Sequence, residues 1–143
     1  MKALGELTRQ ARTDAIPDFL EFISTWARQA GYGEQRVRDM ESAVKEALTN
    51  IVEFVCTEGE EVTVQVGDDK GRRFVINISD SGKPYNMLFE ADPFLSGNDP
   101  SEKRPSVRWI KKIGDVEYKR FEGKNHLVVT VYPLSGSVSA PSA

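Results

Sequence analysis

The sequence predicts an α+β fold, a two-layer sandwich in which helices cover one face of a mixed, mostly antiparallel sheet. Two observations lead to this prediction. Apolar residues recur at helical spacing through two long segments in the first half of the chain. Four segments with alternating apolar residues follow in two pairs, and a turn joins the members of each pair. Strands grouped in hairpins favour antiparallel pairing, with the helices packed together on one side.

Each element follows from a local pattern. Pro17 is tolerated in the first turn of a helix, and Gly31 breaks the helical periodicity that begins near it. A second apolar stripe runs from Val37 to Val55. The expected elements, in order, are strand Leu4–Ala11, helix Ile16–Ala30, helix Glu34–Cys56, strands Val62–Val66 and Phe74–Ile78, loop Asp80–Arg104, short helix Val107–Ile113, and strands Val116–Phe121 and His126–Tyr132.

Composition indicates one globular domain, expected over residues 1–133 and followed by a small, polar, disordered tail at 134–143. A net charge of −3 argues against direct binding of nucleic acid. No apolar run is long enough for a membrane span or a signal peptide, and the single Cys56 excludes an internal disulfide. A cytoplasmic location is therefore expected.

The long helix carries a polar pair at the edge of its apolar stripe. Glu46 and Asn50 are four residues apart, so they lie on one face, one turn from each other. Both could be solvated surface residues, as most charged side chains are. Alternatively they line a cleft, where Glu46 could act as a general base and Asn50 could offer its oxygen to magnesium.

A second polar group follows the strand Phe74–Ile78. Asp80 stands just beyond the strand end, and its carboxylate could accept a hydrogen bond from an amino group such as that of adenine. Gly82 would let the backbone approach a flat base closely. The same residues also suit an ordinary turn, so both interpretations stay open.

Together these segments resemble the anti-sigma-factor serine kinases of the GHKL, or histidine-kinase-like, ATPase superfamily. The resemblance rests on Glu41–Phe54, Val75–Tyr85 and Asp115–Val131. It implies a domain that binds ATP with Mg²⁺, in which Glu46 is the catalytic base and Asn50 the metal ligand. Asp80 would bind adenine and Gly82 would make room for it. Such proteins phosphorylate a serine of a small antagonist protein and also bind a sigma factor.

The sequence departs from this family where a second glycine-rich box should face the ATP phosphates. Glu102–Trp109 contains no glycine, and Pro105 removes a backbone donor. Arg104 and Arg108, with neighbouring lysines, could hold phosphates by charge instead. The same basic residues could also form a solvated face.

Three functions remain open at this point. The first is a protein-serine kinase of a partner-switching pathway. The second is a catalytically weak or dead module of the same fold that sequesters a sigma factor or antagonist. The third, a histidine-kinase fragment, is disfavoured because the chain shows no helical hairpin with a phosphoacceptor histidine. A homodimer is kept as a further alternative among the partners.

Overall fold

Five strands form one sheet in the order β1-β2-β3-β5-β4, and all four pairings are antiparallel. The computed structural model describes residues 2–69, 73–97, 99 and 101–133, so the tail expected at 134–143 lies outside the described residues. Both hairpins expected from the sequence are confirmed. The strands are β1 Lys2–Gln10, β2 Glu61–Asp69, β3 Arg73–Asp80, β4 Asp115–Phe121 and β5 Lys124–Val131.

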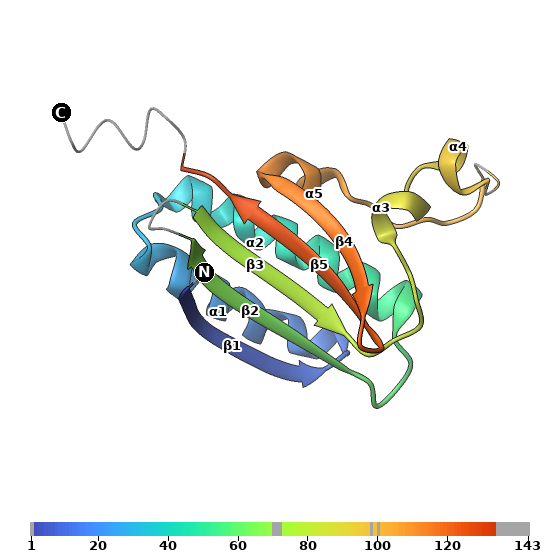
Figure 1. Cartoon of the computed structure of the whole chain (residues 1–143), viewed down its shortest axis with the longest axis horizontal. Helices are drawn as coiled ribbons and strands as arrows, with labels where there is room; N and C mark the ends of the chain where they lie inside the picture. The colour runs from blue at the N-terminus through green and yellow to red at the C-terminus, as the bar shows by residue number, and fades with distance from the viewer. Residues whose placement is uncertain (1, 70–72, 98, 100, 134–143) are drawn as a thin grey trace.

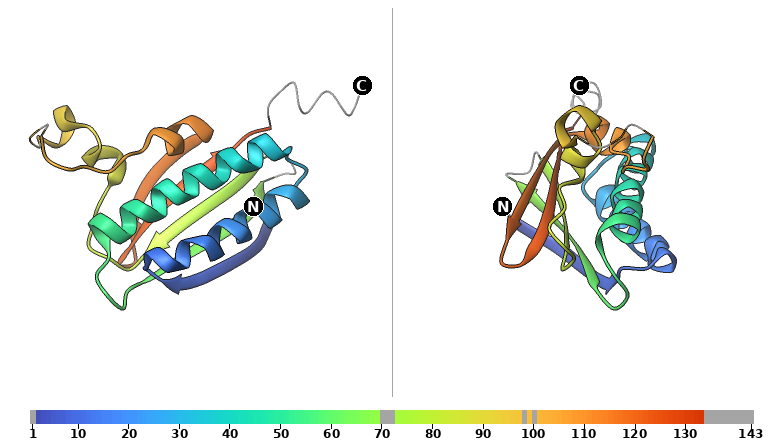
Figure 2. Two further views of the ribbon diagram at one scale, coloured as in Figure 1. Left: turned by 180° about the vertical axis from the view of Figure 1, so that it is seen from behind. Right: turned by 90° about the vertical axis from the view of Figure 1, so that its right-hand side faces the viewer.

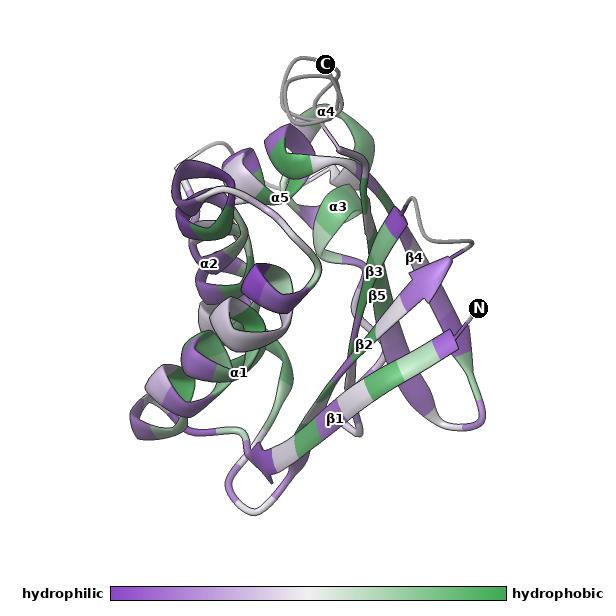
Figure 3. Ribbon diagram, turned by 90° about the vertical axis from the view of Figure 1, so that its left-hand side faces the viewer, coloured by the Kyte–Doolittle hydropathy of each residue, from purple (hydrophilic) through white to green (hydrophobic). Residues whose placement is uncertain are grey.

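Two long helices pack side by side on one face of this sheet, which gives the predicted two-layer fold (Figures 1 and 2). Helix α1, Ile16–Gln29, follows a short 3₁₀ turn at Thr13–Ala15, and helix α2 spans Glu34–Asn50. The layer between helices and sheet, seen edge-on in Figure 3, holds the alternating strand residues and the apolar stripes of both helices. No helix within the described ranges is long and apolar enough to cross a membrane.

The end of the second helix differs from the prediction of one helix to Cys56. Regular α-helix ends at Asn50, and a wider π-helical turn follows at Ile51–Val55. The N–H of Cys56 bonds the carbonyl of Ile51, five residues back, at 2.9 Å. This widening keeps both Ile51 and Val55 buried, a packing requirement that a sequence periodicity does not reveal.

The segment between β3 and β4, expected to be a loop with one short helix, contains three short helices. These are α3 Met87–Glu90, α4 Pro93–Ser96 and α5 Arg108–Ile113. Helices α3 and α4 project beyond the end of the sheet, and we call Asn86–Gly97 the arm (Figure 1). Helix α5 packs against α2 at the edge of the helical layer. The candidate site lies between α2, the end of β3 and this connecting segment.

Candidate functional site

Glu46 lies on α2 and reaches the start of α5. Its Oε1 accepts hydrogen bonds from the backbone N–H groups of Trp109, at 2.8 Å, and Ile110, at 3.0 Å. Its Oε2 accepts one from the hydroxyl of Ser106 at 2.6 Å. The first N–H groups of a helix lack partners within it, and negative charge is favourable there. Val107, which precedes α5, makes no side-chain cap, so Glu46 caps α5 from a neighbouring helix.

Asn50 holds the same segment one helical turn further along α2. Its side chain is only 4% exposed, and its Nδ2 donates to the carbonyl oxygen of Ser106 at 2.7 Å. A longer contact of 3.5 Å joins Nδ2 to the sulfur of Met87. The residues expected to be the catalytic base and the magnesium ligand therefore both bind the backbone that enters α5.

Asp80 is the last inward-facing residue of β3 and is 4% exposed. Its Oδ1 accepts hydrogen bonds from the Gly82 N–H and from Asn125 Nδ2, both at 2.9 Å. Burial raises the pKa of the Asp80 carboxyl, while hydrogen bonds from Asn125, Gly82 and Cys56 act in the opposite direction. Burial, followed by the charge of Asp80, raises the pKa of the Cys56 thiol to about 12, so the thiol stays protonated and donates.

Asn125 faces Asp80 across the sheet, because β3 and β5 pair these two residues directly. Besides Asp80, its Nδ2 donates to the carbonyl of Lys83 at 2.7 Å. Its Oδ1 accepts from the Tyr85 N–H at 3.1 Å and from the Tyr118 hydroxyl at 2.6 Å. A carboxamide has two donor hydrogens and two acceptor positions, so all four are used. Asn125 thus clamps the loop after β3 onto the end of the sheet.

Gly82 packs against the last turn of the helix that precedes β2. A Cβ at this position would lie 2.8 Å from Val55 Cγ1 and 3.0 Å from the Val55 carbonyl oxygen. Nearby, the rings of Phe54 and Tyr85 stack with centroids 6.1 Å apart and planes 8° apart. Because Gly82 has no side chain, the loop after β3 packs directly against the turn Ile51–Val55 at the end of the second helix.

A groove of about 510 Å³ opens between α2 and the segment before α5. Its lining includes Lys45, Glu46, Asn50, Phe54, Arg104 and Trp109. The two arginines expected to act together are separated by the fold. Arg104 lines the groove and donates to the Asp99 carbonyl at 2.7 Å, whereas Arg108 is exposed on α5 and is not part of the lining.

The contacts that these residues make show whether Mg-ATP fits among them. Glu46 and the Asn50 amide bind the segment that would have to face the phosphates, and that segment lies directly on α2. Asp80 Oδ1 is bound by Asn125 and Gly82, and Val55 fills the space beside Gly82. In this arrangement these polar groups bind other parts of the chain, so Mg-ATP would fit only after the segment Ser106–Ile110 leaves α2.

Several participants in this network were not recognised in the sequence. Ser106 lies in the segment without glycine, and its hydroxyl bonds Glu46 and does not cap α5, so no local pattern marks it. The stacking of Phe54 on Tyr85 carried no signal, because the two residues are far apart in the sequence. The bond from Tyr118 to Asn125 spans only seven residues, but no local pattern indicates it.

Comparison with known proteins agrees with this architecture. A profile of the histidine kinase-like ATPase domain family matches residues 10–131. A crystal structure of the RsbU and RsbW domains of Rv1364c from Mycobacterium tuberculosis superposes with a TM-score of 0.61 at 12% sequence identity. The match covers 90% of this chain but only 32% of that one. No curated protein sequence matches significantly. With the profile covering most of its length, the chain belongs to the histidine kinase-like ATPase domain family.

Proposed function

We propose that this domain is a regulatory module of a partner-switching pathway that binds a protein partner without phosphorylating it. The partner class follows from the resemblance to anti-sigma-factor serine kinases: a small antagonist protein or a sigma factor. The fold shared with a solved protein that contains RsbU and RsbW domains supports a regulatory role of this kind. The family implies ATP and Mg²⁺ as ligands, and in our proposal neither is needed for partner binding.

One observation carries the proposal. Glu46 and Asn50, the residues on which phosphotransfer would depend, hold the segment Ser106–Ile110 against α2 through four hydrogen bonds of 2.6–3.0 Å. A glycine-rich loop would turn its backbone N–H groups toward phosphates. Here the N–H groups of Trp109 and Ile110 point at Glu46 instead. The Glu46 carboxylate and these two backbone donors therefore satisfy each other's hydrogen bonds, so neither is free to bind a ligand.

A protein-serine kinase is the second candidate, and a specific observation favours it. The resemblance gives Glu46, Asn50, Asp80 and Gly82 the family's catalytic and adenine-binding roles, and these residues lie on α2, at the end of β3 and in the loop that follows it. Phosphotransfer would require the segment Ser106–Ile110 to leave α2, which would break all four hydrogen bonds. A kinase predicts a specific pattern of mutant effects. Asn50→Ala should weaken nucleotide binding only with magnesium present, whereas Asp80→Ala should weaken the binding of ATP and ADP alike.

Calorimetric titration with adenosine, ADP and Mg-ATP, at low and at high salt, separates the two candidates. We expect Mg-ATP to bind little better than adenosine. Any preference for ATP should come from Lys103, Arg104 or Arg108, and it should fade as salt rises, because the Debye length is only about 8 Å at physiological salt. Arg108→Ala and Arg104→Ala identify the cation responsible, and Lys119→Ala on the distant β4 is the control.

Micromolar, salt-insensitive binding with a strong preference for ATP over ADP would overturn the proposal and establish the kinase. So would transfer of labelled phosphate from ATP to a co-purified antagonist protein that Glu46→Gln abolishes. Partner binding that persists unchanged in buffer without nucleotide supports the binding module.

A further inference from the structure

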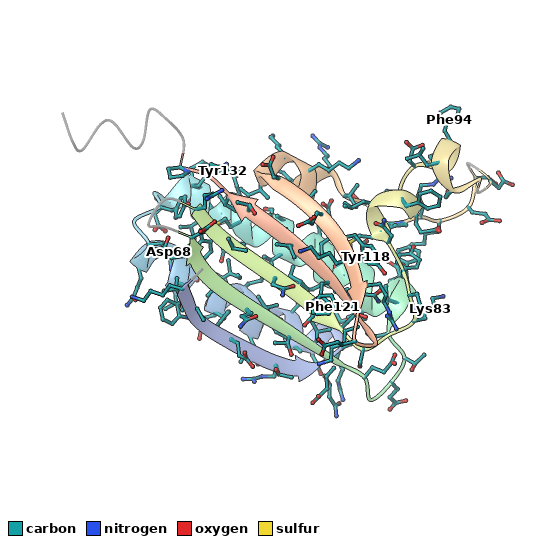
Figure 4. All side chains as sticks on the ribbon, in the orientation of Figure 1. Asp68, Lys83, Phe94, Tyr118, Phe121 and Tyr132 are labelled. Atoms are coloured by element: carbon teal, nitrogen blue, oxygen red, sulfur yellow. The ribbon has the colours of Figure 1, made fainter. Side chains whose placement is uncertain are left out.

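The arm carries the most exposed aromatic residue of the described chain. Phe94 is 96% exposed, and its neighbour Leu95 is 62% exposed. Phe89 on α3 adds a third exposed apolar side chain, at 43%. In Figure 4, Phe94 stands at the end of the arm, away from the sheet and the two long helices. Clustered exposed apolar side chains on a projecting segment mark a surface that contacts another protein.

The arm is held in shape by its own side chains. Asn86 Oδ1 accepts from the N–H groups of Leu88, at 3.0 Å, and Phe89, at 3.3 Å, which caps α3. Asp92 Oδ1 accepts from the Phe94 N–H at 2.9 Å, which caps α4. A segment fixed in this way loses less conformational entropy when it docks than a flexible one would. The exposed side chains are therefore presented in a preformed geometry.

The groove beside α2 has the complementary chemistry. Phe54 and Trp109 supply aromatic surface within its volume of about 510 Å³, and Lys45 and Arg104 supply positive charge. Its carboxylates are already engaged, because Glu53 pairs with Lys103 and Glu46 caps α5. A concave site with aromatic walls and a few charged groups suits an aromatic anchor with acidic neighbours.

Acidic and basic residues are separated in the sequence on either side of residues 102 and 103. From Pro84 to Glu102 the sequence has four acidic residues and no Lys, Arg or His. From Lys103 to Ile113 it has five Lys or Arg and no acidic residue. Of these residues, Glu90 and Asp92 lie in the arm, and Lys103 and Arg104 line the groove together with Lys45. Each copy of the chain therefore presents an acidic aromatic arm and a basic aromatic groove, which are complementary to each other.

We propose that the arm of one copy docks in the groove of a second copy, with Phe94 as the apolar anchor. Because each copy carries both an arm and a groove, the exchange can be reciprocal, and a reciprocal exchange closes a two-fold dimer without leaving a free end. This inference does not depend on the regulatory role proposed above, since it concerns contacts between copies of this chain.

Sedimentation velocity and light scattering, from low-micromolar to submillimolar protein, test the proposal. The wild type should pass from 16.0 kDa to twice that mass as concentration rises. Phe94→Ser should raise the dimer dissociation constant at least about tenfold, as expected for a buried aromatic anchor. Phe121→Ser, at a 48% exposed position on β4, is the matched control and should leave it unchanged. Lys45→Glu should weaken the dimer, whereas Lys119→Glu should not.

Mixing two defective variants tests the reciprocal arrangement. In an equimolar mixture of Phe94→Ser and Lys45→Glu, the mixed dimer has one unaltered contact and one contact that carries both changes, so its dissociation constant should lie between those of the two homodimers. Contact between two arms alone predicts that Lys45→Glu has no effect, and contact between two grooves alone predicts that Phe94→Ser has none. A wild type that stays monomeric throughout would overturn the proposal and leave the arm to a different protein. Identical association of wild type and Phe94→Ser, with unchanged circular dichroism, would also overturn it.

Discussion

Replacing Glu46 distinguishes its structural role from a catalytic one. In Glu46→Ala the N–H groups of Trp109 and Ile110 lose their acceptor, and Ile110 is buried. Loss of a helix cap costs about 1 kcal/mol, and leaving buried donors unpaired adds about 1–3 kcal/mol. We therefore expect the free energy of unfolding to fall by about 2–4 kcal/mol, a large share of the roughly 5–15 kcal/mol typical of a domain.

Glu46→Gln should behave quite differently. Its remaining oxygen can accept from both N–H groups, and its amide can donate to the Ser106 hydroxyl. Only the favourable interaction of negative charge with the start of α5 is lost, which is worth about 0.3–1 kcal/mol. A general base, by contrast, is lost equally in both variants. The difference between Ala and Gln therefore measures the capping role directly.

Urea denaturation at neutral pH, followed by circular dichroism, gives these free energies from the midpoint and slope. Glu53→Ala is the matched control, because Glu53 also contacts the segment before α5 but through an ion pair with Lys103 near the surface. Such pairs contribute about 0–1 kcal/mol. Equal costs for Glu46→Ala and Glu53→Ala, or for Glu46→Ala and Glu46→Gln, would refute the capping argument.

Three further predictions concern the end of β3. Asn125→Ala should cost about 1–3 kcal/mol in urea unfolding, yet it should bind adenosine more tightly than wild type in calorimetry, because Asp80 Oδ1 gains a free acceptor position. Since burial raises the pKa of Asp80, the folded state holds more protons than the unfolded state between the two pKa values, so this residue makes stability fall as pH rises through that window. Asp80→Asn should therefore be more stable than wild type at pH 7, with a gain that shrinks toward pH 4 in the same unfolding assay. Gly82→Ala should lower the thermal midpoint because its Cβ meets the fixed Val55 carbonyl at 3.0 Å, costing about 1–3 kcal/mol, whereas Gly33→Ala, with open space around it, should change little.

The layered fold could be predicted because it depends on short-range patterns. The alternation in β3 and β5 and the apolar stripes of α1 and α2 are visible within windows of ten residues. The two short helices of the arm were not predicted, although their capping residues can be recognised in the sequence. Asn86 and Asp92 are typical N-cap residues, and each precedes a pair of apolar residues. Helices of four residues are too short to show periodicity, so a loop was the natural interpretation.

The site could be predicted only as a set of positions. Glu46 and Asn50 share a helical face and Asp80 ends a strand, as the sequence indicates. Their hydrogen-bond partners could not be predicted, because Glu46 meets Ser106 and Asp80 meets Asn125 across separations of 60 and 45 residues. Such pairings are set by how the connecting segment packs, which no local pattern in the sequence indicates.

This packing changes what the presence of the motif residues means. Once Ser106–Ile110 rests on α2, Glu46 and Asn50 are needed to satisfy backbone groups that would otherwise be half-buried without partners. Asp80 and Asn125 are needed in the same way at the end of the sheet. These residues therefore have a structural reason to be present that is independent of nucleotide chemistry. Their presence alone does not separate a kinase from a binding module. The segment Glu102–Trp109, which contains no glycine and turns the N–H of Trp109 toward Glu46 on α2, is the place where the two proposals make different demands on the structure.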